Sequence, residues 1–349
     1  MGYRLDPQQP VADEVRRVAE HQFTLAIARL TSAGDATSDG SVHTARRHVK
    51  KVRALIRLVR PALGRGYRAL DRRLREVNRT LAPIADAQAT AAMLPRVVWR
   101  DGGDLPADVV ARLRDSVVRR ESMAYEDAAL NDVFGTTAAL LRAERDAIRD
   151  WHLGHIGFHG VARGLERTAR KSRRAMRKAL ASSRVEDYRT WRQLAKYHWL
   201  QVRLLKGRCG GGLDLDERRL EALDGYLGDC RNCAILREVL TADSQLDRTD
   251  AARGLHAVRR YERELRRCAR KLGTAIYAET PKDFVRRVER LWRVTRPTRR
   301  TPGRSAWPGH LAHVQGQWLP SPAPRRTQGR VRSSQRVRNG TATLRRSQP

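Results

Sequence analysis

Residues 42–60 read VHTARRHVKKVRALIRLVR, and the spacing of residue types in this stretch indicates the fold class. Apolar residues recur at alternating intervals of three and four, the period of an α-helix that buries one face. This apolar row consists of Val42, Ala45, Val49, Val52, Ile56 and Val59. Beside it runs a basic row at the same intervals: His43, Arg46, Lys50, Arg53, Arg57 and Arg60. The stretch therefore predicts a helix whose buried seam is bordered along its length by positive charge.

The same spacing returns 146 residues further along the chain. The second basic row consists of Arg189, Arg192, Lys196, Trp199, Arg203 and Lys206. At the same offset, Leu81 with Asp86 corresponds to Leu227 with Asn232. An internal duplication explains the shared spacing, and the alternative is a chance likeness between two arginine-rich helices. From the duplication we infer two homologous helical bundles that lie side by side.

Helical periodicity extends over most of the chain up to residue 294, and the aromatic content of 5% fits a sheet-rich fold poorly. The sequence therefore predicts an all-α protein. We expect helices near residues 11–31, 42–59, 67–81, 83–98, 107–133, 136–151, 158–181, 185–206, 215–228, 230–243, 248–278 and 282–294. We expect one domain over residues 1–294, with a first bundle at about 11–151 and a second at about 152–294.

Residues 295–349 differ in composition from the rest of the chain. These 55 residues contain seven of the fourteen prolines, twelve arginines and no acidic residue. Such a segment buries too little apolar surface to offset the entropy of ordering, so we expect a disordered basic tail. We interpret it first as an extension without function, and the alternative is a tail that binds nucleic acid.

The charge balance limits the partners of the protein. Lys and Arg number 71 against 38 Asp and Glu, which gives a formal net charge of +33. A polyanion relieves the self-repulsion of such a chain, which points to nucleic acid, an anionic membrane surface or an inorganic polyanion. The N-terminus lacks the apolar core of a signal peptide, and no apolar run approaches the ~18 residues of a membrane span. We therefore expect a cytoplasmic protein without a membrane partner.

A third basic concentration lies directly before the second basic row. Residues 167–184 contain eight Lys and Arg and no acidic residue. Consecutive helices of a bundle are antiparallel neighbours, so the basic faces of these two helices are expected to converge on one groove. The candidates from this segment are Arg170, Arg173 and Arg177; the alternative for each is a solvated surface side chain.

The two basic stretches resemble a known family. The run VHTARRHVKKVRALIRLVR is similar to the first motif of CHAD domains, and YRTWRQLAKYHWLQVRLL resembles their second motif. The resemblance implies two four-helix bundles related by pseudo-two-fold symmetry, with a central basic channel that holds a polyphosphate chain. It implies polyphosphate-binding roles for His43, Arg46, Lys50, Lys51, Arg53, Arg57, Arg189, Arg192, Lys196 and Arg203. Lys206 continues the second basic row and is included with them.

The sequence departs from the family pattern in its second half. Arg189 occupies the histidine position of the second motif, and Gln193 replaces a basic residue. In the segment that follows, Arg231 and Asn232 stand at the histidine and acidic positions. Positive charge is largely retained, so phosphate binding is expected to survive these changes, whereas a pH-sensitive role for paired histidines is in doubt.

Other chemistry has weaker support. His152, His155 and His159 have a spacing that suits metal ligands, but three glycines weaken a helix there, and Cys230 and Cys233 lack a second CxxC. We expect no metal and no cofactor. No Walker A, G-x-G-x-x-G, H-E-x-x-H or G-x-S-x-G string is present, which favours binding without catalysis. The prediction is non-catalytic binding of inorganic polyphosphate in a basic channel, with polyphosphate granules as the expected cellular site; the alternative is sequence-nonspecific nucleic-acid binding.

Overall fold

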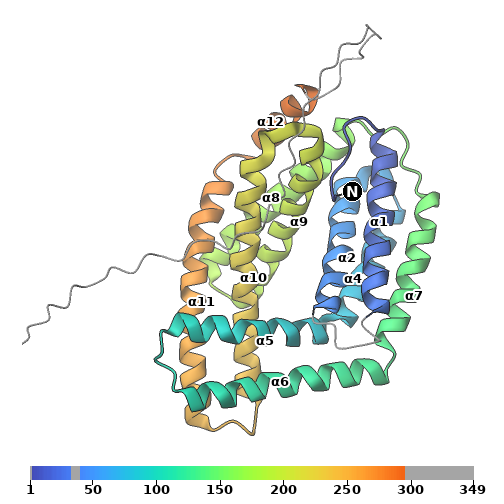
Figure 1. The fold of residues 1–349 in the computed structure, drawn as a ribbon. Helices are drawn as coiled ribbons and strands as arrows, with labels where there is room; N and C mark the ends of the chain where they lie inside the picture. The colour runs from blue at the N-terminus through green and yellow to red at the C-terminus, as the bar shows by residue number, and fades with distance from the viewer. Residues whose placement is uncertain (1, 33–39, 295–349) are drawn as a thin grey trace, which may run out of the picture. The chain divides into compact units, whose positions relative to one another are not determined.

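A computed structural model describes residues 2–32 and 40–294, and these residues form helices joined by short turns without any strand (Figure 1). The prediction of an all-α fold is confirmed. The predicted tail at 295–349 lies outside the described residues. The α-helices are α1 (Val11–Thr31), α2 (Ser41–Leu58), α3 (Arg60–Leu63), α4 (Gly66–Thr80), α5 (Ala82–Asp101), α6 (Ala107–Leu130), α7 (Val133–Asp146), α8 (Phe158–Ser182), α9 (Val185–Cys209), α10 (Asp214–Ala242), α11 (Arg248–Ile276) and α12 (Pro281–Val294).

Two groups of four helices can be distinguished by their packing. In the first group α1 packs against α2 and α7, and α4 packs against the same two helices. In the second group α9 packs between α8 and α10, and α10 packs against α11. The apolar rows predicted from the sequence form the seams: all six apolar positions of the row on α2 are fully buried. The pseudo-two-fold relation between the two groups stays a prediction.

The helical hairpin of α5 and α6 connects the two groups. Ile84 at the start of α5 and Ala128 near the end of α6 belong to the large core that contains the apolar residues of the first group and part of the second. Between these points the hairpin crosses α10 and α11 (Figure 1), and Val97 and Leu113 share a core with Leu236 of α10. The apolar residues of residues 82–130 are therefore divided between two cores. The bundle boundary expected near residue 151 stays a prediction.

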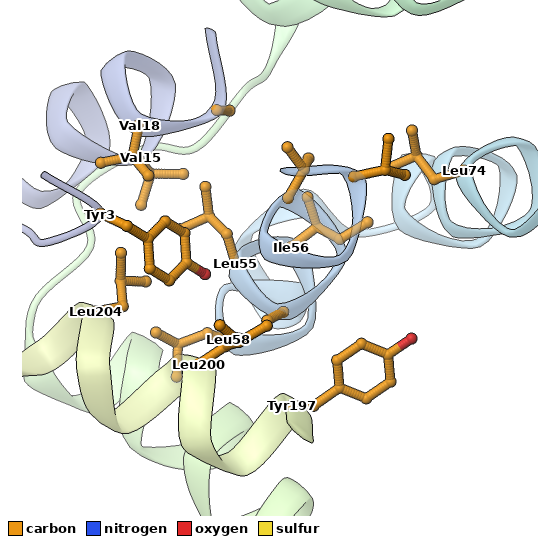
Figure 2. Close-up of a cluster of buried hydrophobic side chains, with 14 of the residues drawn as sticks. Tyr3, Val15, Val18, Leu55, Ile56, Leu58, Leu74, Tyr197, Leu200 and Leu204 are labelled. Atoms are coloured by element: carbon orange, nitrogen blue, oxygen red, sulfur yellow. The ribbon is translucent and has the colours of Figure 1, made fainter. Parts of the chain in front are cut away.

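Helices α2 and α9 bring the two groups into contact. Leu55 and Leu58 of α2 lie in one buried cluster with Leu200 and Leu204 of α9 (Figure 2). The side-chain amide of Gln201 donates a hydrogen bond of 3.1 Å to the Ala54 carbonyl, which satisfies a buried group at this interface. The predicted duplicated helices are thus the two that meet.

One helix prediction was wrong. The sequence predicted separate helices at 215–228 and 230–243, and this interval contains Gly225 and Gly228. The structure has one continuous helix, α10. Leu227 and Cys230 are buried on either side of the expected break, so tertiary packing outweighs the glycine cost of about 1 kcal/mol per residue.

Gly164 allows α8 to approach the C-terminal end of α2. A Cβ atom at this position would overlap with the backbone carbonyl of Leu58, which cannot move aside as a flexible side chain can. We therefore expect Gly164→Ala to lower the free energy of unfolding by about 1–3 kcal/mol in urea denaturation. Gly225 in α10 is the matched control, since a Cβ there meets nothing within 4 Å. Gly225→Ala should raise the free energy of unfolding by about 0.5–1 kcal/mol. Equal stability of the two variants would contradict the close approach.

Candidate functional site: a basic cleft between α2 and α9

A cavity of about 230 Å³ lies where α2 and α9 face α4, α5 and α10. Its lining combines seven Lys and Arg side chains with a single carboxylate, that of Asp86. The seven cationic residues are Arg46, Lys50, Arg53, Arg189, Arg192, Lys196 and Arg231. His43, Asn78, Tyr197 and Asn232 also line the cavity. This basic cleft contains members of both predicted basic rows.

The position of the cations follows from the helical period. On α2 the apolar row faces the core, so the basic row one residue further round the helix lies at the edge of the buried region. The same relation holds on α9, where Trp191 and Ala195 are fully buried next to Arg192 and Lys196. When the two seams pack together, the two basic rows must approach each other.

Asp86 bridges the two halves of the chain. Its carboxylate accepts a hydrogen bond of 3.4 Å from Arg46 of α2 and one of 2.6 Å from Arg231 of α10. Burial acts to raise the pKa of Asp86, but Arg231 and Arg46 outweigh it and hold this pKa below its usual value. Asp86 therefore stays ionised and neutralises part of the charge. Arg231 was missing from the sequence-based site residues, although its position beside Asn232, the equivalent of Asp86, was a signal that pointed to it.

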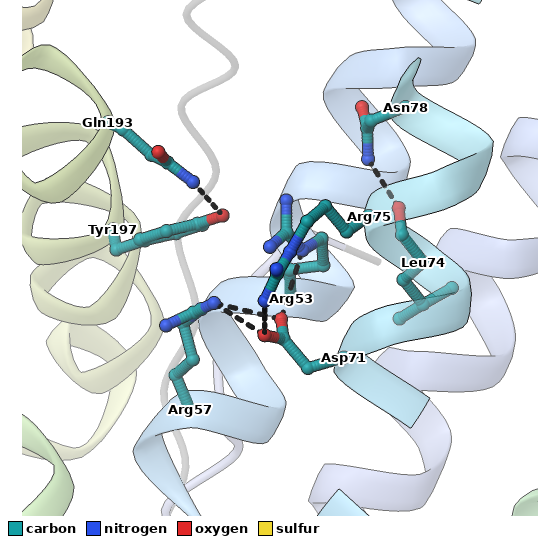
Figure 3. Close-up of polar contacts among 8 residues, drawn as sticks. All are labelled: Arg53, Arg57, Asp71, Leu74, Arg75, Asn78, Gln193 and Tyr197. Carbon is teal, nitrogen blue, oxygen red and sulfur yellow. Dashed lines mark hydrogen bonds and ion pairs between the residues drawn. The ribbon is translucent and has the colours of Figure 1, made fainter. Parts of the chain in front are cut away.

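A second carboxylate, Asp71 of α4, holds the other end of the row on α2 (Figure 3). It accepts hydrogen bonds from Arg53 Nε at 3.1 Å, Arg57 Nη2 at 2.7 Å and Arg75 Nη2 at 3.3 Å. The guanidinium of Arg57 also lies 4.5 Å from the centre of the Tyr197 ring. These contacts keep the Arg57 side chain away from the cleft, which it does not line. Arg53 keeps one buried nitrogen, Nη2, without a hydrogen-bond partner.

Lys196 of α9 has its own counter-ion. Its ammonium group lies 2.5 Å from the carboxylate of Asp224 on α10. Both side chains are mostly buried, with 14% and 12% of their surface exposed. Such a buried pair holds the lysine in place and removes its charge from the balance of the cleft.

The side chains of Lys50, Arg189 and Arg192 form no hydrogen bond or ion pair with any other described residue. Arg189 is exposed, whereas Lys50 and Arg192 are partly buried. Burial, together with the charges of Arg46, Arg192, Lys196 and Arg231, holds the pKa of Lys50 well below the ordinary lysine value. Burial also lowers the pKa of Arg192, although the carboxylates of Asp224, Asp86 and Asp229 oppose this effect. The Nε atom of Arg192 is buried without a partner. The centre of the cleft thus holds two cations, Lys50 and Arg192, that have no counter-ion in direct contact within the described chain.

His43 lies near one end of the row on α2 and is exposed to solvent. Desolvation by the packed groups around its ring, together with the charges of Lys50, Arg47 and Arg46, lowers its pKa to about 4. His43 is therefore neutral at pH 7. It can donate or accept a hydrogen bond there without adding charge.

Several predicted site residues lie elsewhere. Lys51 is turned toward the ring of Tyr3, with Nζ 5.5 Å from its centre. Arg203 and Lys206 form ion pairs with Glu217. The predicted convergence of the segment 167–184 on the cleft is not observed: Arg170, Arg173 and Arg177 do not line it. Arg170 and Arg177 are exposed on α8, and Arg170 pairs with Glu166 of its own helix.

A larger cavity adjoins the basic cleft. It measures about 880 Å³ and is bounded by the α5–α6 hairpin, the start of α9 and the C-terminal part of α10. Asp86 and Arg189 line both cavities, so the two are contiguous. Its lining adds three cations, Arg79, Arg119 and Arg120, and two carboxylates, Glu238 and Asp243, of which Asp243 is paired with Arg119. Met123 and Ile235 make part of its wall apolar.

A metal site and a reactive or zinc-binding cysteine pair were also considered from the sequence. Among residues 2–32 and 40–294, no group of three or more His, Cys, Asp and Glu side chains is arranged to hold a metal ion. Cys230 and Cys233 are buried in a core, and burial raises the pKa of both thiols. No helix in the described part of the chain is long and apolar enough to cross a membrane.

Comparisons with known proteins gave a family match and a similar solved structure. A family model described as "CHAD domain" matches residues 17–241, an interval that contains both basic rows. Among solved structures the chain is similar to "PptA from Streptomyces chartreusis", with a TM-score of 0.56 and 14% sequence identity. This alignment covers 78% of the present chain and 100% of the other, and at such low identity it shows a shared fold alone. No curated protein matches the sequence.

The ion pairs of Asp71 predict a strong effect on stability. We expect Asp71→Asn to lower the free energy of unfolding by about 3–5 kcal/mol, because Arg53 and Arg57 lose a buried counter-charge. Glu289→Gln is the control, since Glu289 forms an exposed pair with Arg293 on one helix, and a change within about 0.5 kcal/mol is expected. Urea denaturation monitored by circular dichroism measures both. If Asp71→Asn were as stable as Glu289→Gln, the arginines would not depend on this carboxylate.

Proposed function

The chain belongs to the CHAD domain family, and we propose that it binds inorganic polyphosphate in the basic cleft without changing it chemically. One observation carries this proposal: seven cationic side chains and one carboxylate line a single cavity, and that carboxylate is already held by two arginines. A ligand that supplies negative charge is the complement of such a lining.

The arrangement of the cations favours a linear anion over a compact one. On α2 the lining extends from His43 to Arg53, which corresponds to about 15 Å of helix at ~1.5 Å per residue. On α9 it extends from Arg189 to Tyr197. A condensed phosphate chain repeats its ionised oxygens along its length and contacts cations on both helices at once. The contiguous larger cavity offers such a chain a direction in which to continue.

The state of the carboxylates supports binding rather than hydrolysis. Asp86 is ion-paired with Arg46 and Arg231, and Asp224 is paired with Lys196. The carboxylate of Asp86 has a lowered pKa and is occupied by two guanidinium groups, which makes it a poor general base at neutral pH. The residues of the cleft are therefore suited to hold phosphate oxygens in place.

Single-stranded nucleic acid is the main rival ligand, and the aromatic residues argue against it. Binders of single strands stack bases on exposed aromatic rings. Near the basic rows Trp191 is fully buried, and Tyr197 and Trp199 are only 3% and 7% exposed. We propose inorganic polyphosphate as the partner, in the cytoplasm and at polyphosphate granules.

Removal of the two cations without counter-ions tests the cleft as the site. We expect Lys50→Ala combined with Arg192→Ala to weaken binding of long-chain polyphosphate by about tenfold or more and to flatten its dependence on salt. Calorimetric titration over a range of salt concentrations measures both effects. The control is Arg263→Ala combined with Arg267→Ala, which removes two exposed charges from α11 and should change affinity little.

The same titrations with single- and double-stranded DNA at matched salt separate the rival functions. Polyphosphate should bind more tightly than either DNA, and only polyphosphate binding should depend on Lys50 and Arg192. Equal losses in the cleft variant and the α11 variant would assign binding to diffuse surface charge and overturn the proposed site.

Lys50 predicts a pH dependence with a defined sign. Its pKa is lowered by burial and by nearby cations in the free protein, and a bound anion favours the protonated lysine. Binding therefore takes up a proton wherever free Lys50 is neutral, so affinity should fall as pH rises from neutral toward the ordinary lysine pKa of about 10.4. Lys50→Arg remains charged throughout this range and should remove that part of the decline. An unchanged pH profile in this variant would show that Lys50 does not titrate with binding.

A further inference from the structure

The internal offset of 146 residues pairs ionic contacts as well as sequence positions. Arg57 forms an ion pair with Asp71 at 2.7 Å, and at the equivalent positions Arg203 pairs with Glu217 at 3.6 Å. The acid and the base of this contact are thus both retained in each half of the chain. We therefore use the same offset of 146 residues to compare the other charged positions of the basic cleft.

Two further ion pairs are present in one half of the chain, whereas the equivalent positions in the other half lack the carboxylate. Lys196 pairs with Asp224 at 2.5 Å, whereas the equivalent positions in the first half are Lys50 and Asn78. Each half keeps its lysine, but in the first half an uncharged amide, Asn78, occupies the position equivalent to Asp224.

In the other contact it is the second half of the chain that has an asparagine in place of the aspartate. Arg46 pairs with Asp86 at 3.4 Å, whereas the equivalent positions in the second half are Arg192 and Asn232. The first half has therefore lost the counter-ion of its lysine, and the second half has lost that of its arginine. All four of Lys50, Asn78, Arg192 and Asn232 line the same cavity.

These exchanges explain which cations are without a partner. Lys50 and Arg192 are two of the three lining cations that form no ion pair within the described chain, and the third, Arg189, is exposed and corresponds to His43 at the same offset. Arg192 contributes to the lowered pKa of Lys50. A donor atom, Arg192 Nε, and an acceptor atom, Asn78 Oδ1, are both buried without hydrogen-bond partners. An unsatisfied buried donor such as the Nε–H of Arg192 costs free energy in the empty protein and can donate to an oxygen of a bound anion, whereas the acceptor atom of Asn78 gains nothing from a phosphate oxygen.

We propose that Asn78 and Asn232 are the specificity-determining positions of the basic cleft, and that the pair Lys50 and Arg192, one from each half, binds two successive phosphoryl units of a condensed phosphate. The inference rests on the proposed function. An aspartate at position 78 or 232 competes with the ligand for the neighbouring cation, whereas an asparagine leaves the cation available. Because the two cations come from opposite helices, a condensed phosphate can place one phosphoryl unit at each of them, whereas a single orthophosphate offers only one unit to both.

The test is to restore the missing carboxylates with nearly isosteric substitutions. We expect Asn78→Asp and Asn232→Asp each to weaken binding of tripolyphosphate by about tenfold, and the double variant to weaken it further. Binding of orthophosphate, already weak, should change little. Asn131→Asp, an exposed position at the end of α6, adds the same charge outside the cleft and should leave affinity within about twofold of the wild type.

Two further measurements keep the result independent of misfolding. Circular dichroism melting reports whether the aspartate variants are folded, and closure of an ion pair should leave the melting temperature unchanged or higher. Asp224→Asn makes the reverse change, because it releases Lys196, and should strengthen tripolyphosphate binding. If the aspartate variants destabilise the fold, tripolyphosphate binding by Asp224→Asn tests the proposal in their place.

The outcomes separate the two proposals. If the wild type binds no condensed phosphate, the proposed function is overturned. If the wild type binds tripolyphosphate but the folded double variant binds it equally well, or if Asp224→Asn weakens binding, the cleft remains the site and only the role of the asparagines is overturned.

Discussion

The burial of two apolar helix faces against each other determines where the charge of this protein lies. Leu55 and Leu58 on α2 meet Leu200 and Leu204 on α9, and each fully buried leucine contributes about 1.5–3 kcal/mol. Two unit charges about 8 Å apart repel by about 2 kcal/mol at an effective dielectric constant of ~20. Several buried leucines therefore outweigh the repulsion between a few cations. The seam forms, and the basic rows that border it are forced into one cleft.

Carboxylates form ion pairs with some of these cations and leave others without a direct counter-ion. Asp71 neutralises the end of the row on α2, Asp224 neutralises Lys196, and Asp86 joins Arg46 to Arg231 across the two halves. Each of these pairs fixes a long side chain that would otherwise lose its order, so the walls of the cleft are held in place without a ligand. The lining cations that remain without a direct counter-ion within the described chain are Lys50, Arg192 and the exposed Arg189. A preorganised site with a localised excess of positive charge is the physical basis for the proposed anion binding.

Most of the fold and part of the cleft could be predicted from the sequence, because both depend on periodicity. The row from Val42 to Val59 is buried as its spacing predicted, and Arg46, Lys50, Arg192 and Lys196 line one cavity as the bordering rows implied. Contacts between distant segments could not be predicted. The crossing of α5 and α6 to α10 depends on surface shape, and a single sequence gives no partner for Val97 or Leu113. For the same reason Arg57 was assigned to the cleft, although Asp71 of α4 draws it away.

The distribution of the two asparagines between the halves has a structural consequence of its own. If both exchanges lay in one half, that half would hold two buried cations without any counter-ion, and its basic helix would lack an ion pair inside the cleft. In the arrangement observed, α2 keeps Arg46 paired with Asp86 and α9 keeps Lys196 paired with Asp224. Each helix thus retains one fixed cation as an anchor and offers one free cation to the centre. Support and binding are divided in this way between α2 and α9, because each helix supplies one paired cation and one cation without a direct counter-ion.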